Sequence, residues 1–316
     1  MIPTRKLRHA VVLAEQRSFR KAAEALNLTQ PALSRSIQSL ERALGVPLFD
    51  RSLGAVEPTA SGRLVVDRAR EILLGIAELE HEIELLQGLS AGTLEVSLGP
   101  YPSALSGQLA VARLLVDHPE IQCHVRVAAF SGVADDVEAG RCEVGIADLG
   151  IPSAHGLVTE LLTDRQVHFF ARPQHPLAAR KRPALEDMLR YPWAGIRAPA
   201  RMNAHLPADG GRAGRWDRRS GEFVPALEID MVSDVLVLAR ESDVLAIATF
   251  TMVEEELAKE QLAVVRFAPP WLRLCYGFIS RPNHTLSPVT TEFMAIVREI
   301  EADLEAREAS LRKKYL

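Results

Sequence analysis

The sequence predicts a chain of three parts: an all-α N-terminal domain built around a helix-turn-helix, a long linker helix, and an α/β C-terminal domain of two lobes. Three observations predict this fold class. Two short helical patterns joined by a tight turn occupy residues 18–44, and a regular apolar spacing follows over residues 65–86. Strand-like and helix-like segments then alternate over roughly 220 residues, which is typical of an α/β fold with mostly parallel strands.

The second helix of the N-terminal pair has two distinct faces. Thr29 is a good N-cap, and Gln30 and Pro31 follow it in the first turn. Apolar residues at i, i+4, i+7 and i+11, from Leu33 to Leu44, form one stripe that must pack on a core. The opposite face carries the side-chain groups that contact base edges and phosphates in a major groove: Gln30, Ser34, Arg35 and Gln38.

The charge distribution indicates what this helical domain meets. The first helix of the pair begins after Ser18, and its small apolar residues face inward. A further helix precedes it and packs on the same core. A three-helix domain whose polar face is only solvated is the alternative. Residues 1–70 carry 12 Lys and Arg against 6 Asp and Glu, whereas the rest of the chain carries 25 against 35. A basic head on an acidic body indicates that only the head contacts a polyanion.

The predicted linker helix carries a heptad seam. Its apolar residues are separated by alternating steps of four and three, a pattern that requires a partner helix. Packing on the core of its own domain is the alternative, but the position between two domains favours a homodimer with two recognition helices on two half-sites. Residues 88–92 then read as a short flexible joint. The seam consists of Val65, Ala69, Ile72, Ile76, Leu79, Ile83 and Leu86.

The C-terminal domain is expected to contain at least six strands and five helices. The strand candidates have short apolar runs, and the helical segments have apolar residues at helical spacing. The length of this part of the chain allows two small subdomains. Strands are predicted at residues 94–98, 122–128, 144–147, 167–171, 244–248 and 276–280, and helices at 104–117, 133–139, 233–240, 252–258 and from Ser287 onward.

The N-terminal residues resemble a known family. The segment from Ser18 to Arg51, with the run AAEALNLTQPALSRSIQSLERALGVPLFDR, closely resembles the N-terminal domain of LysR-type transcriptional regulators. The resemblance implies a winged hairpin from Phe49 to Thr59, and it implies a dimer or a tetramer. The expected domains are a winged helix-turn-helix at 1–58, a dimerisation linker at 59–89 and an effector-binding domain at 90–316. The expected DNA-binding residues are Ser18, Thr29, Gln30, Pro31, Ser34, Arg35, Gln38 and Arg51.

The same resemblance implies that the C-terminal domain looks like a periplasmic binding protein, with a small-molecule effector between its lobes. Lobe I would hold about 93–163 and 268–300, and lobe II about 164–267. The effector expected is a small organic acid or aromatic, and an arginine at Arg197 would suit a carboxylate. A solvated Arg-rich loop is the alternative for that residue. Effector contacts are expected at Tyr101, Pro102, Ser103, Phe130, Ser131, Ile196, Arg197, Thr249 and Phe250.

One segment of that set has a local rationale. The run from Gly99 to Ser103 leaves a strand and opens a helix, so free backbone N–H groups and the Ser103 hydroxyl are expected to hold an anion. Ser103 as a simple helix cap is an equal alternative.

Enzyme and metal motifs are missing from the sequence. It contains no HExxH, CxxC or GxxxxGK[ST] pattern, and the GxSxG run at residues 88–92 reads as the flexible joint and not as a nucleophile elbow, so we expect no catalysis, no cofactor and no metal. Cys123, Cys142 and Cys275 are expected to be inert, a redox switch between the first two being the alternative. Without an apolar leader or a spanning segment, a cytoplasmic protein with no membrane contact is expected.

The expected partners follow from this interpretation. They are double-stranded DNA, a small-molecule effector and further copies of the chain in a homodimer or a homotetramer. RNA polymerase is a further candidate. Two rival interpretations remain open. One is a solute-binding or enzymatic α/β domain with a helical assembly head, and the other is a DNA-bending regulator without ligand control. Salt-dependent DNA binding separates the first rival from a regulator, and ligand-induced stabilisation separates the second.

Overall fold

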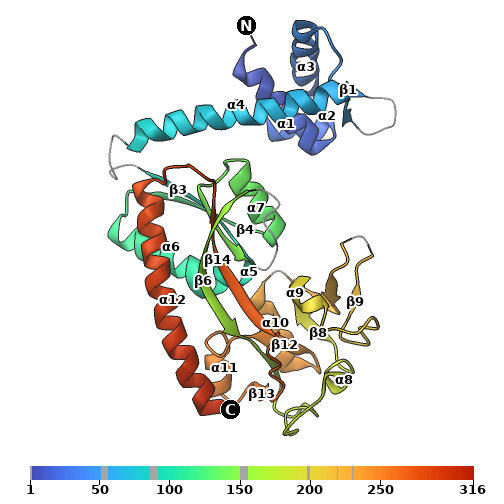
Figure 1. The fold of residues 1–316 in the computed structure, drawn as a ribbon, viewed down its shortest axis with the longest axis vertical. Helices are drawn as coiled ribbons and strands as arrows, with labels where there is room; N and C mark the ends of the chain where they lie inside the picture. The colour runs from blue at the N-terminus through green and yellow to red at the C-terminus, as the bar shows by residue number, and fades with distance from the viewer. Residues whose placement is uncertain are drawn as a thin grey trace. The chain divides into compact units, whose positions relative to one another are not determined.

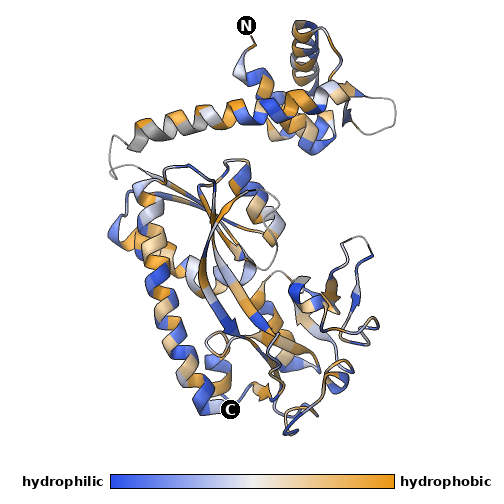
Figure 2. Ribbon diagram, viewed as in Figure 1, coloured by the Kyte–Doolittle hydropathy of each residue, from blue (hydrophilic) through white to orange (hydrophobic). Residues whose placement is uncertain are grey.

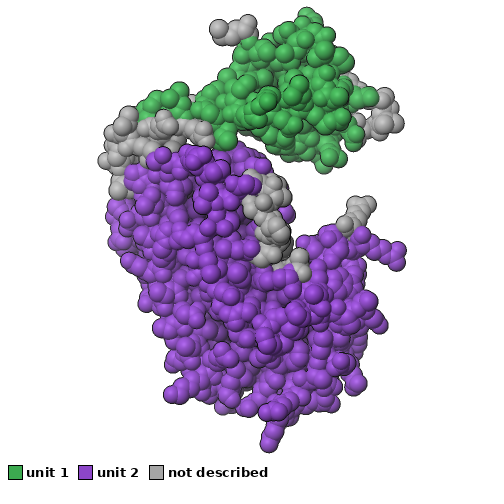
Figure 3. Space-filling view, in the orientation of Figure 1, with its two compact units in different colours: residues 1–86 green, residues 87–316 purple. Residues whose placement is uncertain are grey.

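The computed structural model describes the chain except for its first residue and a few short loops (Figure 1). Hydrophobic and hydrophilic residues alternate along the helices, as expected for elements with one buried face (Figure 2). The chain divides into two compact units, Met1–Leu86 and Gln87–Leu316 (Figure 3). The described residues are 2–50, 56–85, 92–149, 156–197, 200–218, 220–229 and 231–316.

The first unit contains the predicted helix-turn-helix. Ser18 Oγ accepts a hydrogen bond from the Lys21 N–H, and Thr29 Oγ1 accepts one from the Ala32 N–H, each at 3.4 Å. Both predicted N-caps are therefore confirmed. Asn27 supplies the tight turn in a left-handed conformation, with φ of 52°. The elements are α1 (Thr4–Gln16), α2 (Phe19–Ala25), α3 (Gln30–Leu44), β1 (Phe49–Asp50), β2 (Glu57–Pro58) and α4 (Ala60–Leu85).

A winged hairpin follows the recognition helix. β1 and β2 pair antiparallel, with Phe49 opposite Pro58, and this confirms the expected strands of the wing. α3 ends at Gly45, whose φ of 74° favours glycine. Glu41 near the end of α3 accepts the backbone N–H of Leu48 at 2.8 Å, which fixes where the chain enters the wing. Arg51, an expected DNA-binding residue, lies outside the described residues.

The long helix α4 uses its apolar seam in two ways. Near its start, Ala69 is buried in the core formed by α1, α2 and α3, and Val65 packs against that core. Here the alternative of packing within the same domain holds. Further along, Ile72, Leu79 and Ile83 are 49%, 57% and 49% exposed. This second half of the seam has its apolar side chains uncovered. Leu86 and the predicted joint as far as residue 91 lie outside the described residues.

The second unit is built on two five-stranded sheets. In the first sheet, ordered β4-β3-β5-β14-β6, the strands β3, β4 and β5 are parallel, and β14 runs antiparallel to both β5 and β6. Its core lies between the sheet and the helices on its two faces. The strands are β3 (Thr93–Leu98), β4 (Gln122–Val127), β5 (Val144–Asp148), β6 (Val158–Gln166) and β14 (Arg273–Ser280).

The second sheet has the order β11-β8-β12-β7-β13, and a separate hairpin, β9–β10, stands beside it (Figure 1). β12 is parallel to β8 and antiparallel to β7, so this sheet is mixed too. The strands are β7 (His168–Ala171), β8 (Trp193–Gly195), β9 (Gly214–Trp216), β10 (Phe223–Pro225), β11 (Leu227–Glu228), β12 (Leu245–Ala248) and β13 (Ala263–Val265).

The prediction of mostly parallel strands is wrong, although all six predicted strands exist. The two five-stranded sheets contain four parallel and four antiparallel pairings. Antiparallel pairs arise where the chain passes between the sheets, through β6 into β7 and through β13 into β14. Apolar periodicity identifies a strand but carries no information on its direction.

The helices of the second unit agree with the predicted set and extend it. α7 begins three residues earlier than expected, which places Phe130 and Ser131 in its first turn. No helix in the described part of the chain is long and apolar enough to cross a membrane. The helices are α5 (Pro100–Pro102), a π-helical turn (Ser103–Gly107), α6 (Gln108–Asp117), α7 (Phe130–Glu138), α8 (Leu185–Met188), α9 (Ala200–Asn203), α10 (Val232–Glu241), α11 (Glu254–Ala258) and α12 (Pro288–Tyr315).

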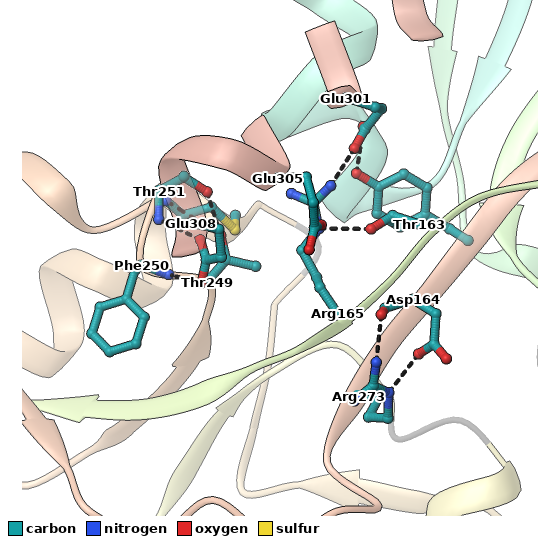
Figure 4. Close-up of polar contacts among 12 residues, drawn as sticks. Thr163, Asp164, Arg165, Thr249, Phe250, Thr251, Arg273, Glu301, Glu305 and Glu308 are labelled. Carbon is teal, nitrogen blue, oxygen red and sulfur yellow. Dashed lines mark hydrogen bonds and ion pairs between the residues drawn. The ribbon is translucent and has the colours of Figure 1, made fainter. Parts of the chain in front are cut away.

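The last helix, α12, is tied to both sheets by buried carboxylates (Figure 4). Glu301 accepts hydrogen bonds from Arg165 of β6 at 2.5 Å and from the Tyr276 hydroxyl of β14 at 2.6 Å. Two turns later, Glu308 accepts the backbone N–H groups of Phe250 and Thr251, which follow β12. The helix therefore links the first sheet to the second.

Candidate functional site

The outer face of α3 is the candidate nucleic-acid interface. Leu33, Ile37 and Leu40 are fully buried on the inner face, so the opposite face of the helix points outward. The side chains of Gln30, Pro31, Arg35 and Gln38 are exposed, and Ser34 is half-buried. Within the described residues, no hydrogen bond or ion pair holds the Gln30, Arg35 or Gln38 side chains. These groups are free to bind a partner.

Contacts from α1 orient this helix. Lys6 Nζ donates to Ser39 Oγ at 2.7 Å, and His9 Nδ1 lies 2.7 Å from Ser36 Oγ. Burial, together with the neighbouring Arg5 and Arg8, lowers the pKa of His9. Polar residues of α3 thus serve two purposes, because those facing α1 fix the helix while those facing outward remain free. No local sequence signal marks this α1 contact, which joins residues 27 to 33 positions apart.

Two further residues of the expected DNA-binding set have structural roles as well. The hydroxyl oxygens of Ser18 and Thr29 accept the capping hydrogen bonds of α2 and α3. Each hydroxyl retains its own proton as a donor. Both residues therefore sit at helix N-termini, where a phosphate is favoured by the exposed N–H groups.

A cavity of about 350 Å³ lies between the two sheets of the second unit. Its walls come from α5 and the start of α7 on the side of the first sheet, and from β8, β10 and β12 on the side of the second. Most of its lining is apolar, which is typical of small-molecule sites. Six of the expected effector residues are on the wall: Tyr101, Pro102, Phe130, Ser131, Ile196 and Arg197.

The other three expected residues do not line this cavity. Ser103 is buried in the helical segment and accepts a hydrogen bond from Gln108 Nε2 at 3.0 Å. Thr249 Oγ1 lies 2.9 Å from Thr251 Oγ1, within the turn after β12. The Phe250 ring packs in the core of the second sheet, against Phe170. All three are buried by their own local structure and face away from the cavity.

The anion cradle expected at residues 99–103 is not formed. Helical structure begins at Pro100, so Ser103 is neither at the N-cap nor on the wall. Pro100 and Pro102 have no N–H group. The N–H groups of Gly99 and Ser103 already donate, to Ile146 O at 2.7 Å and Gly99 O at 2.9 Å. Too few free donors remain here to hold an anion.

Arg197 is held by carboxylates of the protein itself. Its Nε donates to Glu228 at 2.6 Å, and its Nη1 donates to Asp217 at 3.2 Å and lies 3.5 Å from Glu222. The hydrogen bonds to Glu228 and then to Asp217 raise the pKa of this arginine. A ligand carboxylate would have to displace one of these partners.

An ion pair spans the cavity between the two sheets. Arg201 of α9 makes a two-point contact with Asp148 at the end of β5, with Nη2 2.7 Å from Oδ2, and also donates to Arg273 O at 2.9 Å. The Arg201 side chain is only 25% exposed. Arg201 Nε is buried and has no hydrogen-bond partner among the described residues.

A second bridge is made by Tyr101, whose hydroxyl donates to the Ile247 carbonyl of β12 at 2.8 Å. Burial raises the pKa of Tyr101, so the hydroxyl stays protonated. A group of apolar wall residues between positions 193 and 271 was not predicted from the sequence. The sequence feature that points to them is the rarity of tryptophan, because two of the three tryptophans of the chain are among them. These residues are Trp193, Met202, Leu206, Phe223 and Trp271.

The cysteines are free thiols in the structure. Burial raises the pKa of Cys142 to about 12 and also raises that of Cys123. A raised pKa opposes thiolate formation and hence reactivity, which argues against the redox alternative. No cluster of metal-ligating side chains is found in the parts of the chain that are described.

Comparison with known proteins places both units in one family. Residues 4–63 match the family of bacterial regulatory helix-turn-helix proteins of the lysR type, and residues 87–301 match the LysR substrate binding domain. An SDS degradation transcriptional activation protein from a Pseudomonas species is 35% identical over 94% of this chain and 96% of its own length. The transcriptional regulator GalR of Pseudomonas putida is 25% identical over 95% of this chain and 74% of its own length.

Solved structures show the same fold. Full-length OxyR from Pseudomonas aeruginosa superposes with a TM-score of 0.63 at 18% identity, over 95% of each chain. CbnR in complex with its target DNA gives 0.55 at 20% identity, over 94% of this chain and 99% of that one. The relatives and neighbours are transcriptional regulators and not enzymes. This chain belongs to the family of LysR-type, DNA-binding transcriptional regulators, with an N-terminal helix-turn-helix and a C-terminal effector-binding domain.

Proposed function

We propose that the chain binds operator DNA as a dimer or tetramer and that a small, mostly apolar effector in the cavity controls it. Residues 1–58 would bind DNA, 59–89 dimerise and 90–316 bind the effector. The observation that carries the proposal is the free polar face of α3 opposite a fully buried apolar stripe. In the major groove we place Gln30, Pro31, Ser34, Arg35 and Gln38, with Ser18, Thr29 and Arg51 at phosphates.

Dimerisation is supported by the second half of α4. Ile72, Leu79 and Ile83 repeat at heptad spacing and are about half exposed. Burying an apolar side chain of this size on a partner contributes about 1.5–3 kcal/mol. A second copy of α4 offers the same seam, as a two-fold interface requires.

The effector class is inferred from the charges on the cavity wall. Arg197, Arg201 and Arg273 are each paired with a carboxylate of the protein. The described wall carries these three arginines against Asp148, Glu222 and Glu228, so its formal charge is zero. An organic acid, one of the two effector classes expected from the sequence, would find the arginine charges of this wall already neutralised by carboxylates of the protein. We therefore favour an uncharged head group with an apolar body.

The size of the cavity limits that body. One water molecule takes up roughly 30 Å³ of the liquid, and we assign the same volume to each non-hydrogen group. A cavity of about 350 Å³ then holds about 12 such groups. The relative named for SDS degradation supports an alkyl chain, because SDS carries one. We propose a neutral alkyl compound, such as a medium-chain alcohol, whose hydroxyl lies beside the Arg201–Asp148 pair on the cavity wall.

The DNA-binding proposal is tested by titrating the full-length protein against DNA upstream of its own gene in a gel shift. Arg35→Ala should weaken binding by about 10- to 100-fold, the effect of removing a good base contact. Arg42→Ala, an exposed arginine in the last turn of the same helix, is the matched control and should change affinity less than about threefold. Equal effects of the two variants would remove Arg35 from the groove.

The effector proposal is tested by thermal shift with 1-alkanols and with alkanoates of equal chain length. Alkanol affinity should rise about fourfold per methylene, from about 0.8 kcal/mol each, until the cavity is full. Ile196→Trp should block the alkanol shift by filling the cavity. Stronger shifts with alkanoates would show that the head group is anionic. No shift with either series would favour the regulator without ligand control.

A further inference from the structure

The second unit contains a strongly basic segment within an acidic body. Residues 172–219 carry 11 Lys and Arg against 4 Asp and Glu, a net charge of +7. The remainder of residues 71–316 carries 14 against 31, a net charge of −17. A body of that charge repels a polyanion, so one basic segment in it marks the face that such a partner can approach.

Six cations of this segment are exposed, in contrast to the paired arginines of the cavity. Within the described residues, no ion pair or hydrogen bond holds their side chains. They contribute nothing visible to the fold and are free to contact a partner. These residues are Lys181, Arg182, Arg190, Arg212, Arg215 and Arg218. We term the last four of them, which lie on the β9–β10 hairpin or beside the chain that enters it, the basic hairpin surface.

The surface is held on a fixed framework. The Arg212 N–H donates to Leu189 O at 2.9 Å, which places Arg212 beside Arg190 just after α8. Gly211 allows this approach, because its φ of 58° favours glycine and a Cβ would lie 2.7 Å from Leu189 O. Arg215 lies on β9 and Arg218 lies in the turn between β9 and β10, a hairpin that stands beside the second sheet (Figure 1).

The hairpin itself is ordered by an aromatic contact. Trp216 packs edge-to-face on Phe223, with ring centroids 5.7 Å apart, and its Nε1 donates to Pro207 O at 3.0 Å. Arg215 precedes Trp216 on β9 and so points to the opposite side of the strand. Because Trp216 is engaged in this way, it does not offer a platform for stacking single-stranded bases. Exposed guanidinium groups on a rigid hairpin instead suit phosphates of a duplex.

We propose that the basic hairpin surface binds the phosphate backbone of duplex DNA and adds a sequence-independent contact to that of the recognition helix. This inference rests on the proposed DNA-binding function. Its contribution should be salt-dependent and blind to base sequence, because phosphates carry no sequence information. The effector-binding domain would then hold DNA as well as sense a ligand.

The test compares two full-length variants of equal charge change. One replaces Arg212, Arg215 and Arg218 by glutamine, and the control replaces the exposed Arg113, Arg266 and Lys313, which lie outside the segment. Affinity for operator DNA is measured at several salt concentrations, on a short operator and on one extended by flanking duplex. Circular dichroism checks that both variants stay folded, as exposed substitutions should.

The surface variant should lower the slope of log affinity against log salt by about 2 to 3, at about 0.9 for each phosphate that is no longer neutralised. The decrease in affinity should be larger on the extended duplex, while the preference for operator over scrambled DNA is retained. The control should keep the wild-type slope. Equal slopes for the surface variant and the wild type would overturn the inference, and so would an equal decrease in both variants, which reports only net charge.

Failure of the underlying function would look different. If the protein has no DNA-binding function, the wild type itself binds operator no better than scrambled DNA, and Arg35→Ala changes nothing. If only the inference fails, operator binding stays specific and sensitive to Arg35, and the surface variant matches the control. An acidic protein that binds the surface without any change in DNA slope would likewise overturn the inference.

Discussion

Replacing Glu308 by alanine should release the last helix from the second sheet. The Glu308 carboxylate accepts the Phe250 N–H at 2.8 Å and the Thr251 N–H at 2.9 Å, and the residue is 7% exposed (Figure 4). Phe250 is fully buried. With alanine at this position, the two backbone N–H groups would lose this acceptor at a site that is poorly accessible to water. A buried donor without an acceptor is unfavourable because it no longer has its hydrogen bonds to water.

The magnitude follows from the number of hydrogen bonds that the substitution removes. Each unsatisfied buried donor costs about 1–3 kcal/mol, so Glu308→Ala should destabilise the segment after β12 by about 2–6 kcal/mol. Glu305→Ala is the matched control on the same helix. Its carboxylate is 63% exposed, lies 3.6 Å from Arg165 Nε and accepts neither of the two N–H groups that Glu308 binds.

Hydrogen exchange followed by mass spectrometry is the suitable assay, because a chain with two units need not unfold in a single transition. A destabilisation of about 2 kcal/mol corresponds to exchange about 30-fold faster. This acceleration should appear in peptides covering residues 245–253 of Glu308→Ala and not in those of Glu305→Ala. Equal exchange in the two variants would refute the idea that α12 holds the second sheet through this carboxylate.

Three further predictions concern the assembly seam, acid stability and the helical core. Leu79→Asp with Ile83→Asp should convert the dimer to a monomer without unfolding it, as measured by analytical ultracentrifugation, because both side chains are exposed in the single chain; an unchanged dimer would place the interface elsewhere. Burial, and to a smaller extent Arg312, lowers the pKa of His168 to about 4. The unfolded chain therefore binds a proton near pH 6.5, whereas the native chain does not. The contribution of His168 to the free energy of unfolding is complete above that pH, and it falls by about 3 kcal/mol as the pH drops toward 4. His168→Gln should flatten this pH dependence in urea titrations. Leu40→Ala, at a fully buried position, should destabilise the first unit by about 2–5 kcal/mol, and a change below about 1 kcal/mol in thermal unfolding would contradict the packing.

The elements of the first unit could be predicted because their signals are local. Ser18 and Thr29 cap helices through bonds to residues three positions ahead, and Gly45 ends α3 in a left-handed conformation. The apolar stripe from Leu33 to Leu40 repeats within two turns. Each of these signals acts over a few residues, so a single sequence contains all of the information that it needs.

The candidate ligand site could be predicted only in part, because it is assembled from distant segments. Tyr101 bonds to Ile247 across 146 positions, and Arg201 bonds to Asp148 across 53. Neither pairing has a local signature, so Arg201 does not stand out from the other arginines of its segment. Ser103 was placed at a helix start by its capping propensity, but two prolines begin the helix three residues earlier.

The two bridges across the cavity also determine how an effector can act. Tyr101 and Arg201 already join the two sheets, and α12 joins them again. We therefore expect that an effector does not act by closing an open cleft. It shifts the protein only by binding one arrangement better than another.

Arg201 is the group at which ligands would differ in this respect. Its Nη atoms hold Asp148 while its buried Nε has no partner among the described residues. A neutral head group beside this pair does not compete for the guanidinium group and leaves the bridge intact. An anion competes with Asp148 for the guanidinium group and so opposes the bridge. Alkanols and alkanoates of equal length should therefore shift the regulator in opposite directions, measurable as opposite changes in operator affinity. Changes of the same sign would show that Arg201 does not read the charge of the head group.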